Sequence, residues 1–370
     1  MNGSVKQLAE LLRKAGKLNK NILWTVISIL LAVLTINLVL KQNKNISVDG
    51  LLDVIAAADK LFFILGVMTA MLYVWFEGLA LRSILSKAGY PKSPLKSLLY
   101  STSDIYFSAI TPSATGGQPA SAYFMIRDGI PVGITAAALV INLTMYTLSI
   151  IVLGVISVIM DPGGFLKFGD LSRFLIALGF IILSALAALF FISLKNERLI
   201  FIPLSKFITF LYNKKVIREK DRKLAKLEKI RNDYKNCSDL LSKNRKMLSG
   251  AFYWNLAQRA SQLMTPMLIY RSIGGPDVRM ARIFSRQCLV TIGYNFVPIP
   301  GGMGVSDYLM LDSLSSIMDE RTAIAVELIS RGITFYICVT VCGLITLAGW
   351  LLLRGKRHEK SSASASINLK

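Results

Sequence analysis

Long runs of apolar residues alternate with shorter polar segments along this chain of 370 residues. A helix rises about 1.5 Å per residue, so a run of about twenty residues crosses a hydrocarbon core about 30 Å thick. Six runs meet this length, at residues 22–40, 61–81, 131–160, 174–194, 248–269 and 323–353. The pattern predicts an all-α polytopic membrane protein with six full crossings.

Two further apolar segments, residues 98–125 and 283–311, are interrupted near their middle by prolines and paired glycines. These residues disfavour a continuous helix, and the backbone groups that they free cannot face lipid. We therefore predict re-entrant hairpins over residues 98–127 and 283–315, with tips that point into a protein cavity. An ordinary kinked span is the alternative interpretation.

The two interrupted segments also resemble each other. At an offset of 185 residues, five positions are identical: Gly116 and Gly301, Gly117 and Gly302, Ser121 and Ser306, Tyr123 and Tyr308, and Met125 and Met310. This predicts an internal duplication, with repeats over residues 22–160 and 174–353 that share the order span, span, hairpin, span. Three crossings are an odd number, so the second copy is expected to insert upside down, as an inverted-topology repeat.

The distribution of charge predicts the orientation. The formal net charge is +21, and Lys and Arg are concentrated in residues 1–21, 82–96, 195–247 and 354–370. By the positive-inside rule these segments are cytoplasmic. We therefore expect a multi-pass protein of a bacterial cell membrane with a basic N-terminal tail at 1–21, a C-terminal tail at 354–370 and both termini in the cytoplasm.

The cytoplasmic linker 195–247 interrupts the second repeat and is strongly basic. Its apolar residues between 214 and 247 recur mostly every three to four positions, which predicts an amphipathic helix that lies on the anionic lipids of the inner leaflet. Nucleic acid is the alternative partner for such a run. Because the positive-inside bias already explains the charge, no nucleic-acid partner is expected.

Several classes of chemistry are disfavoured by the composition. The single histidine, His358, lies in the polar C-terminal tail, so imidazole-based metal sites and acid–base catalysis are not expected. The four cysteines are interpreted as small structural residues. A P-loop is absent from the sequence. We predict no cofactor, no metal and no catalytic residue, and the sequence favours a transporter over an enzyme.

Ionisable side chains at membrane depth are the candidate functional residues, because each costs at least ~2.5–3.5 kcal/mol at the centre of a span. Arg259 is the deepest charge, and Gln258 and Gln262 lie near it on the same predicted helix. Glu77 lies toward the cytoplasmic end of the second span, and Asp104 lies in the hydroxyl-rich part of the first hairpin. We expect these residues to line a polar cavity.

Four more charged residues belong to the second hairpin and the last span. Arg286 lies at the start of that hairpin, and Asp307 follows its glycine-rich tip. Glu327 and Arg331 are one helical turn apart, so they form either a mutual ion pair or part of the site. The helix N-termini after both glycine tips would offer amide donors suited to a phosphate group.

Two motifs carry a family resemblance. The string Thr111-Pro112-Ser113-Ala114-Thr115-Gly116-Gly117-Gln118-Pro119, followed by Tyr123, Arg127 and Gly129, and the string Pro298-Ile299-Pro300-Gly301-Gly302-Met303-Gly304, followed by Asp307, Arg331 and Tyr336, occur in this order. They resemble the signatures of the lysylphosphatidylglycerol synthase transmembrane family, the flippase-like membrane region of the multiple peptide resistance factor. The resemblance covers residues 20–353.

The resemblance implies a protein that moves phospholipids with a polar headgroup, lysyl-phosphatidylglycerol being the best-known cargo. It also implies that Thr111, Gly116, Gly117, Gln118, Tyr123, Gly301, Gly302, Asp307 and Arg331 are candidate substrate-binding residues. Gln118 and Asp307 stand where the family often has glutamate, so the headgroup contact is expected to differ.

Full-length synthases of this type carry a soluble aminoacyltransferase domain after the membrane region, and no such domain is expected in the 17 residues beyond Leu353. The translocase reading is therefore favoured. The alternative is a membrane component of a phosphatidylglycerol lysyltransferase that acts with a separate aminoacyltransferase. That enzyme and a second copy of the chain, as a homodimer, are the candidate protein partners.

Overall fold

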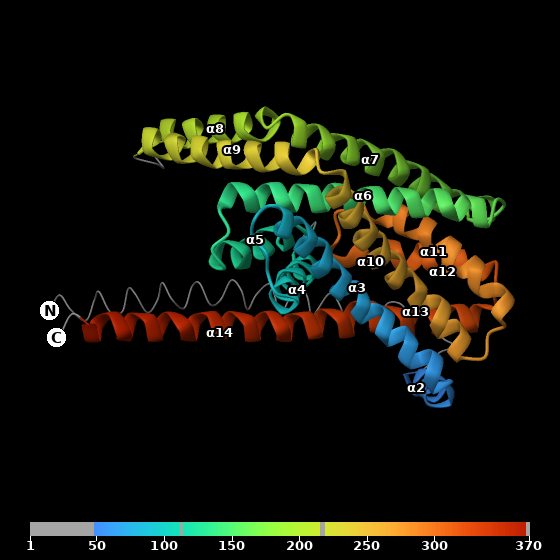
Figure 1. The fold of residues 1–370 in the computed structure, drawn as a ribbon. Coiled ribbons are helices and arrows are strands. Elements are labelled where there is room, and N and C mark those ends of the chain that lie inside the picture. The colour runs from blue at the N-terminus through green and yellow to red at the C-terminus, as the bar shows by residue number, and fades with distance from the viewer. Residues whose placement is uncertain (1–47, 112–113, 215–218, 368–370) are drawn as a thin grey trace.

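The computed structural model describes residues 48–111, 114–214 and 219–367, and these residues form helices and no strands (Figure 1). Four helical segments are long and apolar enough to cross a membrane: Lys60–Lys87, Val132–Met160, Asp170–Lys195 and Glu320–Leu352. This result confirms the prediction of an all-α polytopic membrane protein. The predicted N-terminal tail and the predicted span 22–40 lie outside the described residues.

The helices follow one another along the chain with short connections. In order they are α2 (Val48–Ala57), α3 (Lys60–Lys87), α4 (Pro94–Ile110), α5 (Gly117–Arg127), α6 (Val132–Met160), η2 (Phe165–Lys167), α7 (Asp170–Lys195), α8 (Arg198–Asn213), α9 (Lys220–Ser242), α10 (Arg245–Ser272), η3 (Asp277–Arg279), α11 (Met280–Tyr294), η4 (Pro300–Gly302), α12 (Val305–Ser315), α13 (Glu320–Arg331), η5 (Gly332–Ile337) and α14 (Cys338–Ile367).

Two of the predicted spans differ in detail from the long apolar helices. The predicted span 248–269 lies within α10, a helix of 28 residues that packs along α3 in the most extensive helix contact of the described chain. The polar residues on α10 explain why it is not among the four apolar helices. The predicted span 323–353 is divided by the π-helical turn η5, and α14 continues as a helix to Ile367.

Both interrupted segments are antiparallel helical hairpins, and their ends agree with the predicted bounds. In α4–α5, Gln118 bonds to Asp104 near the tip, while Asp128 at the base accepts bonds from Lys96 and Tyr100. In α11–α12, Arg286 near the start of α11 bonds to the carbonyl of Ser313 near the end of α12. A continuous kinked span would hold these residues apart, so the alternative interpretation does not describe either segment.

The internal repeat extends to helix boundaries and to helix packing. Helices α3 and α10 begin and end 185 residues apart, and α4 and α11 occupy corresponding positions. Each hairpin packs against the last helix of the other repeat, α4 against α14 and α11 against α6. The two halves are thus interlocked. The opposite insertion of the two copies stays a prediction.

The linker 195–247 forms two antiparallel helices, α8 and α9, along one edge of the molecule (Figure 1). The apolar residues of α9 pack into the protein: Tyr234 and Leu241 are fully buried, and Ile230 lies so close to α6 that its carbonyl oxygen would collide with a Cβ on Gly133. The prediction that this face lies on the membrane is therefore wrong. The side of α6 offers the face an apolar surface that water would otherwise cover.

Opposite insertion of the two hairpins predicts labelling of their bases from opposite sides. The four native cysteines are buried and would be replaced by alanine. Leu95→Cys, exposed at the base of α4, should react with an impermeant thiol reagent from the cytoplasmic side, and Ser315→Cys, exposed at the end of α12, only from outside. Reaction of both from one side in inverted and right-side-out vesicles would contradict the inverted repeat.

Candidate functional site

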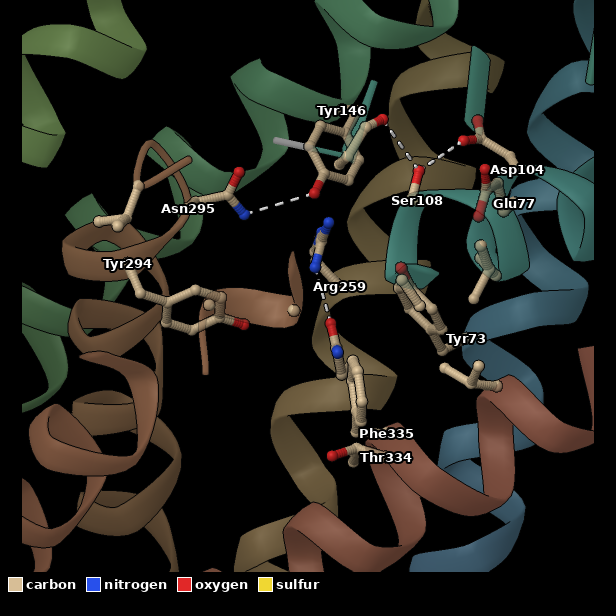
Figure 2. Close-up of a pocket in the computed structure, with 18 of the residues that line it drawn as sticks. Tyr73, Glu77, Asp104, Ser108, Tyr146, Arg259, Tyr294, Asn295, Thr334 and Phe335 are labelled. Carbon is tan, nitrogen blue, oxygen red and sulfur yellow. Dashed lines mark hydrogen bonds between the residues drawn. The ribbon is translucent and has the colours of Figure 1, made fainter. Parts of the chain in front are cut away.

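A polar cavity of about 500 Å³ lies where the two helical hairpins meet. Its walls come from α3 to α6, α10, the end of α11, the loop with η4, the π-helical turn η5 and α14. Figure 2 shows Glu77 and Asp104 on one side, Tyr294 and Asn295 on the other, and Arg259 between them. Both repeats therefore contribute polar groups to one enclosed space.

Arg259 on α10 is 4% exposed and lies in the centre of the cavity. Its guanidinium carbon is 4.0 Å from the ring centroid of Tyr146 and 5.4 Å from that of Tyr73, and its Nη1 donates to Gln262 Oε1 at 2.7 Å. Its Nε has no hydrogen-bond partner, and no acidic side chain forms an ion pair with it among the described residues. A buried cation with this surrounding is suited to an anionic ligand.

An acid pair, Glu77 on α3 and Asp104 on α4, lines another wall. The two carboxyl groups are in hydrogen-bond contact. Gln258 Nε2 donates to Glu77 Oε2 at 3.1 Å, Gln118 Nε2 donates to Asp104 Oδ2 at 2.6 Å, and Ser108 Oγ donates to Asp104 Oδ1 at 3.1 Å. The described part of the chain holds no group of three His, Cys, Asp or Glu side chains placed for a metal ion.

The tip of the first hairpin brings α5 close to α4. The backbone N–H of Gly116 donates to Thr111 Oγ1 at 2.9 Å, so this predicted phosphate donor already has a partner within the tip. Gly117 packs directly on α4, and a Cβ there would lie 2.7 Å from the carbonyl oxygen of Asp104. Thr111, Gly116 and Gly117 therefore shape the tip, while Gln118 extends from it into the cavity.

The tip of the second hairpin reaches the opposite side of the cavity. Gly301 and Gly302 line it with φ angles of 60° and 63°, in the left-handed region that favours glycine. Gly301 packs on the ring of Phe335 in η5, and its carbonyl oxygen accepts a bond from Arg331 Nη2 at 2.8 Å. This bond attaches the tip to the last helical segment.

Arg331 pairs with Asp307 rather than with Glu327. The Nε of Arg331 lies 3.3 Å from Asp307 Oδ1, and the two side chains connect α13 with α12. Glu327 makes no ion pair with Arg331; its carboxyl group contacts Asp307 instead, and its Oε2 has no other partner among the described residues. The mutual Glu327–Arg331 ion pair is therefore not formed, because Arg331 turns toward the neighbouring hairpin.

Tyr123 and Arg286 lie away from the cavity. Tyr123 is 41% exposed and stacks with Arg127 one turn along α5. Arg286 is buried at the base of the second hairpin, where it pairs with Asp161 at 3.3 Å and bonds to Ser313 and Ser316. Arg286 thus joins α11 to α12 and to the end of α6. Gln258, Asp307 and Glu327 contact lining residues without lining the cavity themselves.

Sequence reasoning missed the aromatic and amide side chains of the site. Tyr73, Tyr146 and Tyr294 line the cavity, together with Asn142 and Asn295. Within apolar runs a tyrosine is indistinguishable from a core residue. One usable signal was the π-helical turn, since single π turns recur at functional sites, but such a turn is not visible in a hydropathy pattern.

The fold and the cavity define an integral membrane protein whose polar site is buried among its helices and shared by two interlocked repeats. A model of the family described as the lysylphosphatidylglycerol synthase TM region matches residues 21–342, and the chain belongs to this family. The resemblance stated from the two motifs is thereby confirmed. The chain is a membrane component related to the handling of lysyl-phosphatidylglycerol. A comparison with curated proteins found no match.

Proposed function

We propose that the protein is a lipid translocase that moves a phospholipid with a polar headgroup between leaflets, the cargo being an aminoacyl-phosphatidylglycerol such as lysyl-phosphatidylglycerol. One observation carries the proposal: a buried arginine without an ion-pair partner among the described residues lies in a cavity that both hairpin tips reach. A passage for a charged headgroup needs such a polar site among membrane helices, where an unpaired charge is otherwise costly.

The cavity offers separate contacts for the two charges of this headgroup. The guanidinium of Arg259, in a planar fork, suits the lipid phosphate. The acid pair Glu77 and Asp104 suits the cationic aminoacyl group. Gln262 and Tyr146 hold the guanidinium at the centre of the cavity, so both charges of one headgroup could be bound at once.

Movement of the hairpins would expose the cavity to one leaflet at a time. The Gln118–Asp104 bond closes the first tip over the cavity, and the Arg331–Gly301 bond closes the second. Breaking one set of bonds while the other persists would give alternating access, as in transporters built from paired repeats. In this scheme Arg331 acts as a gating residue and Arg259 as a binding residue.

The proposed setting is the bacterial cell membrane, crossed several times, with both termini in the cytoplasm. The basic faces of α8 and α9 would then face the anionic inner leaflet by charge rather than by insertion of the buried face of α9. A homodimer and a separate aminoacyltransferase stay candidate partners. A membrane component of phosphatidylglycerol lysyltransferase is the alternative function, because the family description names a synthase.

Reconstitution tests the proposed function directly. Liposomes that contain the protein and lysyl-phosphatidylglycerol are treated with an impermeant amine reagent, and the fraction of lipid that reacts is followed over time. We expect it to rise from about half, the outer leaflet, to nearly all, while protein-free liposomes stay at half. Unchanged protection of the inner leaflet would overturn the proposal. Formation of lysyl-phosphatidylglycerol from phosphatidylglycerol and lysyl-tRNA by this chain alone would favour the synthase.

A further inference from the structure

The acid pair holds two carboxyl groups against each other inside the protein. Glu77 and Asp104 are each 6% exposed, and they are side by side in Figure 2, in hydrogen-bond contact. Two adjacent buried carboxylates repel each other strongly, so one of them carries a proton that the pair shares. The empty cavity therefore contains one bound proton at this wall.

The groups that hold the acid pair are neutral. Gln258, Gln118 and Ser108 donate to the outer oxygens of the two carboxyl groups, and neither carboxyl forms an ion pair with a Lys or Arg side chain among the described residues. Neutral donors leave the negative charge of the pair uncompensated. A proton or another small cation can supply that compensation.

The other titratable or charged groups that act on the pair come from three helices. They are Tyr73 on α3, Arg259 on α10 and Cys338 on α14. Arg259 is held away by the ring of Tyr146 and by Gln262, with which it bonds. The cavity thus has a cationic pole at Arg259 and an acidic pole at the acid pair, and neither neutralises the other by direct contact.

An unused acceptor lies beside the acidic pole. Gln258 is 1% exposed, and its Nε2 bonds to Glu77, but its Oε1 has no hydrogen-bond partner among the described residues. A buried acceptor without a donor is destabilising unless a ligand supplies one. An ammonium group has three donors, which matches two carboxyl groups and one amide oxygen.

We propose that the acid pair binds either one proton or the ammonium group of a cationic phospholipid, and that loading this lipid releases the proton. The proposal rests on the function proposed above and deepens it. On loading, the carboxylic O–H bond breaks and the proton passes to water. The pair then carries two negative charges, and the ammonium N–H groups donate to the freed oxygens.

This exchange makes lipid binding depend on pH in one direction. As the pH falls, the pair keeps its proton more firmly, so binding of a lipid with an ammonium headgroup weakens. Phosphatidylglycerol has no ammonium group, and its binding should not follow this dependence. A proton gradient across the membrane would then favour release of the cationic lipid on the more acidic side.

Calorimetric titration of the purified full chain in detergent micelles measures the exchange. Lysyl-phosphatidylglycerol and, separately, phosphatidylglycerol are titrated in two buffers with different ionisation enthalpies, which gives the affinity and the number of protons released. We expect release of about one proton per lysyl-phosphatidylglycerol bound and none for phosphatidylglycerol, because only the ammonium group replaces the shared proton.

Variants separate the acid pair from other proton sources. Glu77→Gln should abolish the proton release, and Asp104→Asn should do the same if the first variant is unfolded by size-exclusion chromatography. Glu320→Gln, at an exposed acid at the start of α13, should release the proton as the unchanged protein does.

The outcomes distinguish this inference from the function on which it rests. Binding of lysyl-phosphatidylglycerol without proton release overturns the inference and leaves the translocase intact. Proton release that persists in both folded acid-pair variants overturns the assignment to Glu77 and Asp104. Failure of the lipid to bind at all overturns the inference and the proposed function together.

Discussion

Arg259→Met is expected to reduce lipid transport by roughly a hundredfold, because a pair of charge-assisted hydrogen bonds to a phosphate contributes about 3 kcal/mol. The variant should fold at least as well as the unchanged protein. Methionine removes a buried charge that has no ion-pair partner among the described residues, and it can pack against Tyr146 and Tyr73. The amine-reagent assay in proteoliposomes measures the transport rate, and thermal unfolding measures stability.

Two further variants make this result specific. Arg259→Lys keeps the charge and loses the planar fork, so transport should fall by less than in the methionine variant. Arg245→Met removes an exposed arginine at the start of the same helix and should leave transport unchanged. Full transport by Arg259→Met, or loss of its folding, would make Arg259 a structural residue.

Gly117→Ala is expected to displace the first hairpin and to abolish transport. A Cβ at this position would overlap the side chains of Asp104 and Ser108 and would lie 2.7 Å from the carbonyl oxygen of Asp104. Because the backbone of α4 cannot yield as a side-chain end can, α5 must move away and the Gln118–Asp104 bond should break. Overpacking of this kind costs about 1–3 kcal/mol or more.

Gly250→Ala is the matched control for this substitution. Gly250 lies on α10, and a Cβ there would meet nothing within 4 Å. Alanine is favoured over glycine inside a helix by about 1 kcal/mol, so this variant should unfold at a slightly higher temperature and transport normally. If Gly117→Ala also unfolds and transports normally, the close contact of α5 with α4 is not needed for the site.

The positions of the buried charges could be predicted from the sequence. Arg259, Glu77 and Asp104 stand out as ionisable residues within apolar runs, and a membrane tolerates such residues mainly beside a polar cavity. The breaks near Gly116 and Gly301 were also visible, because proline and paired glycine interrupt a helix whatever surrounds them. Local chemistry is sufficient for both inferences.

The partners of those charges could not be predicted in the same way. Glu327 and Arg331 are one turn apart, which allows an ion pair, yet Arg331 bonds to Asp307 and to the carbonyl of Gly301. Which partner a long side chain takes depends on where the neighbouring hairpin lies. Tyr146 is a similar case, since only the packing of α6 beside α10 places its ring under Arg259.

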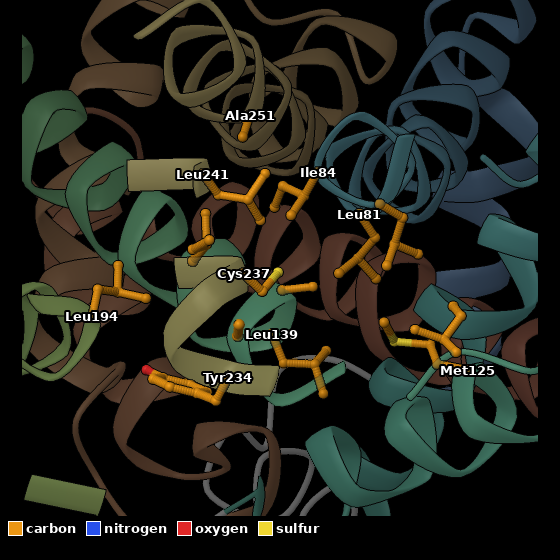
Figure 3. Packing of buried hydrophobic residues seen from close by; sticks show 14 of the residues in the cluster. Leu81, Ile84, Met125, Leu139, Leu194, Tyr234, Cys237, Leu241 and Ala251 are labelled. Atoms are coloured by element: carbon orange, nitrogen blue, oxygen red, sulfur yellow. The ribbon is translucent and has the colours of Figure 1, made fainter. Parts of the chain in front are cut away.

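The linker helix α9 shows the same division between local and tertiary information. Its amphipathic pattern was evident, and a membrane surface or a protein surface satisfies such a pattern equally well. Figure 3 shows Tyr234, Cys237 and Leu241 of α9 packed with Leu139 of α6 and Leu194 of α7 in one core. Hydropathy along a chain reports which face avoids water, because that depends on the side chains alone. What covers the face depends on which helices fold against it, and that is a property of the assembled tertiary structure.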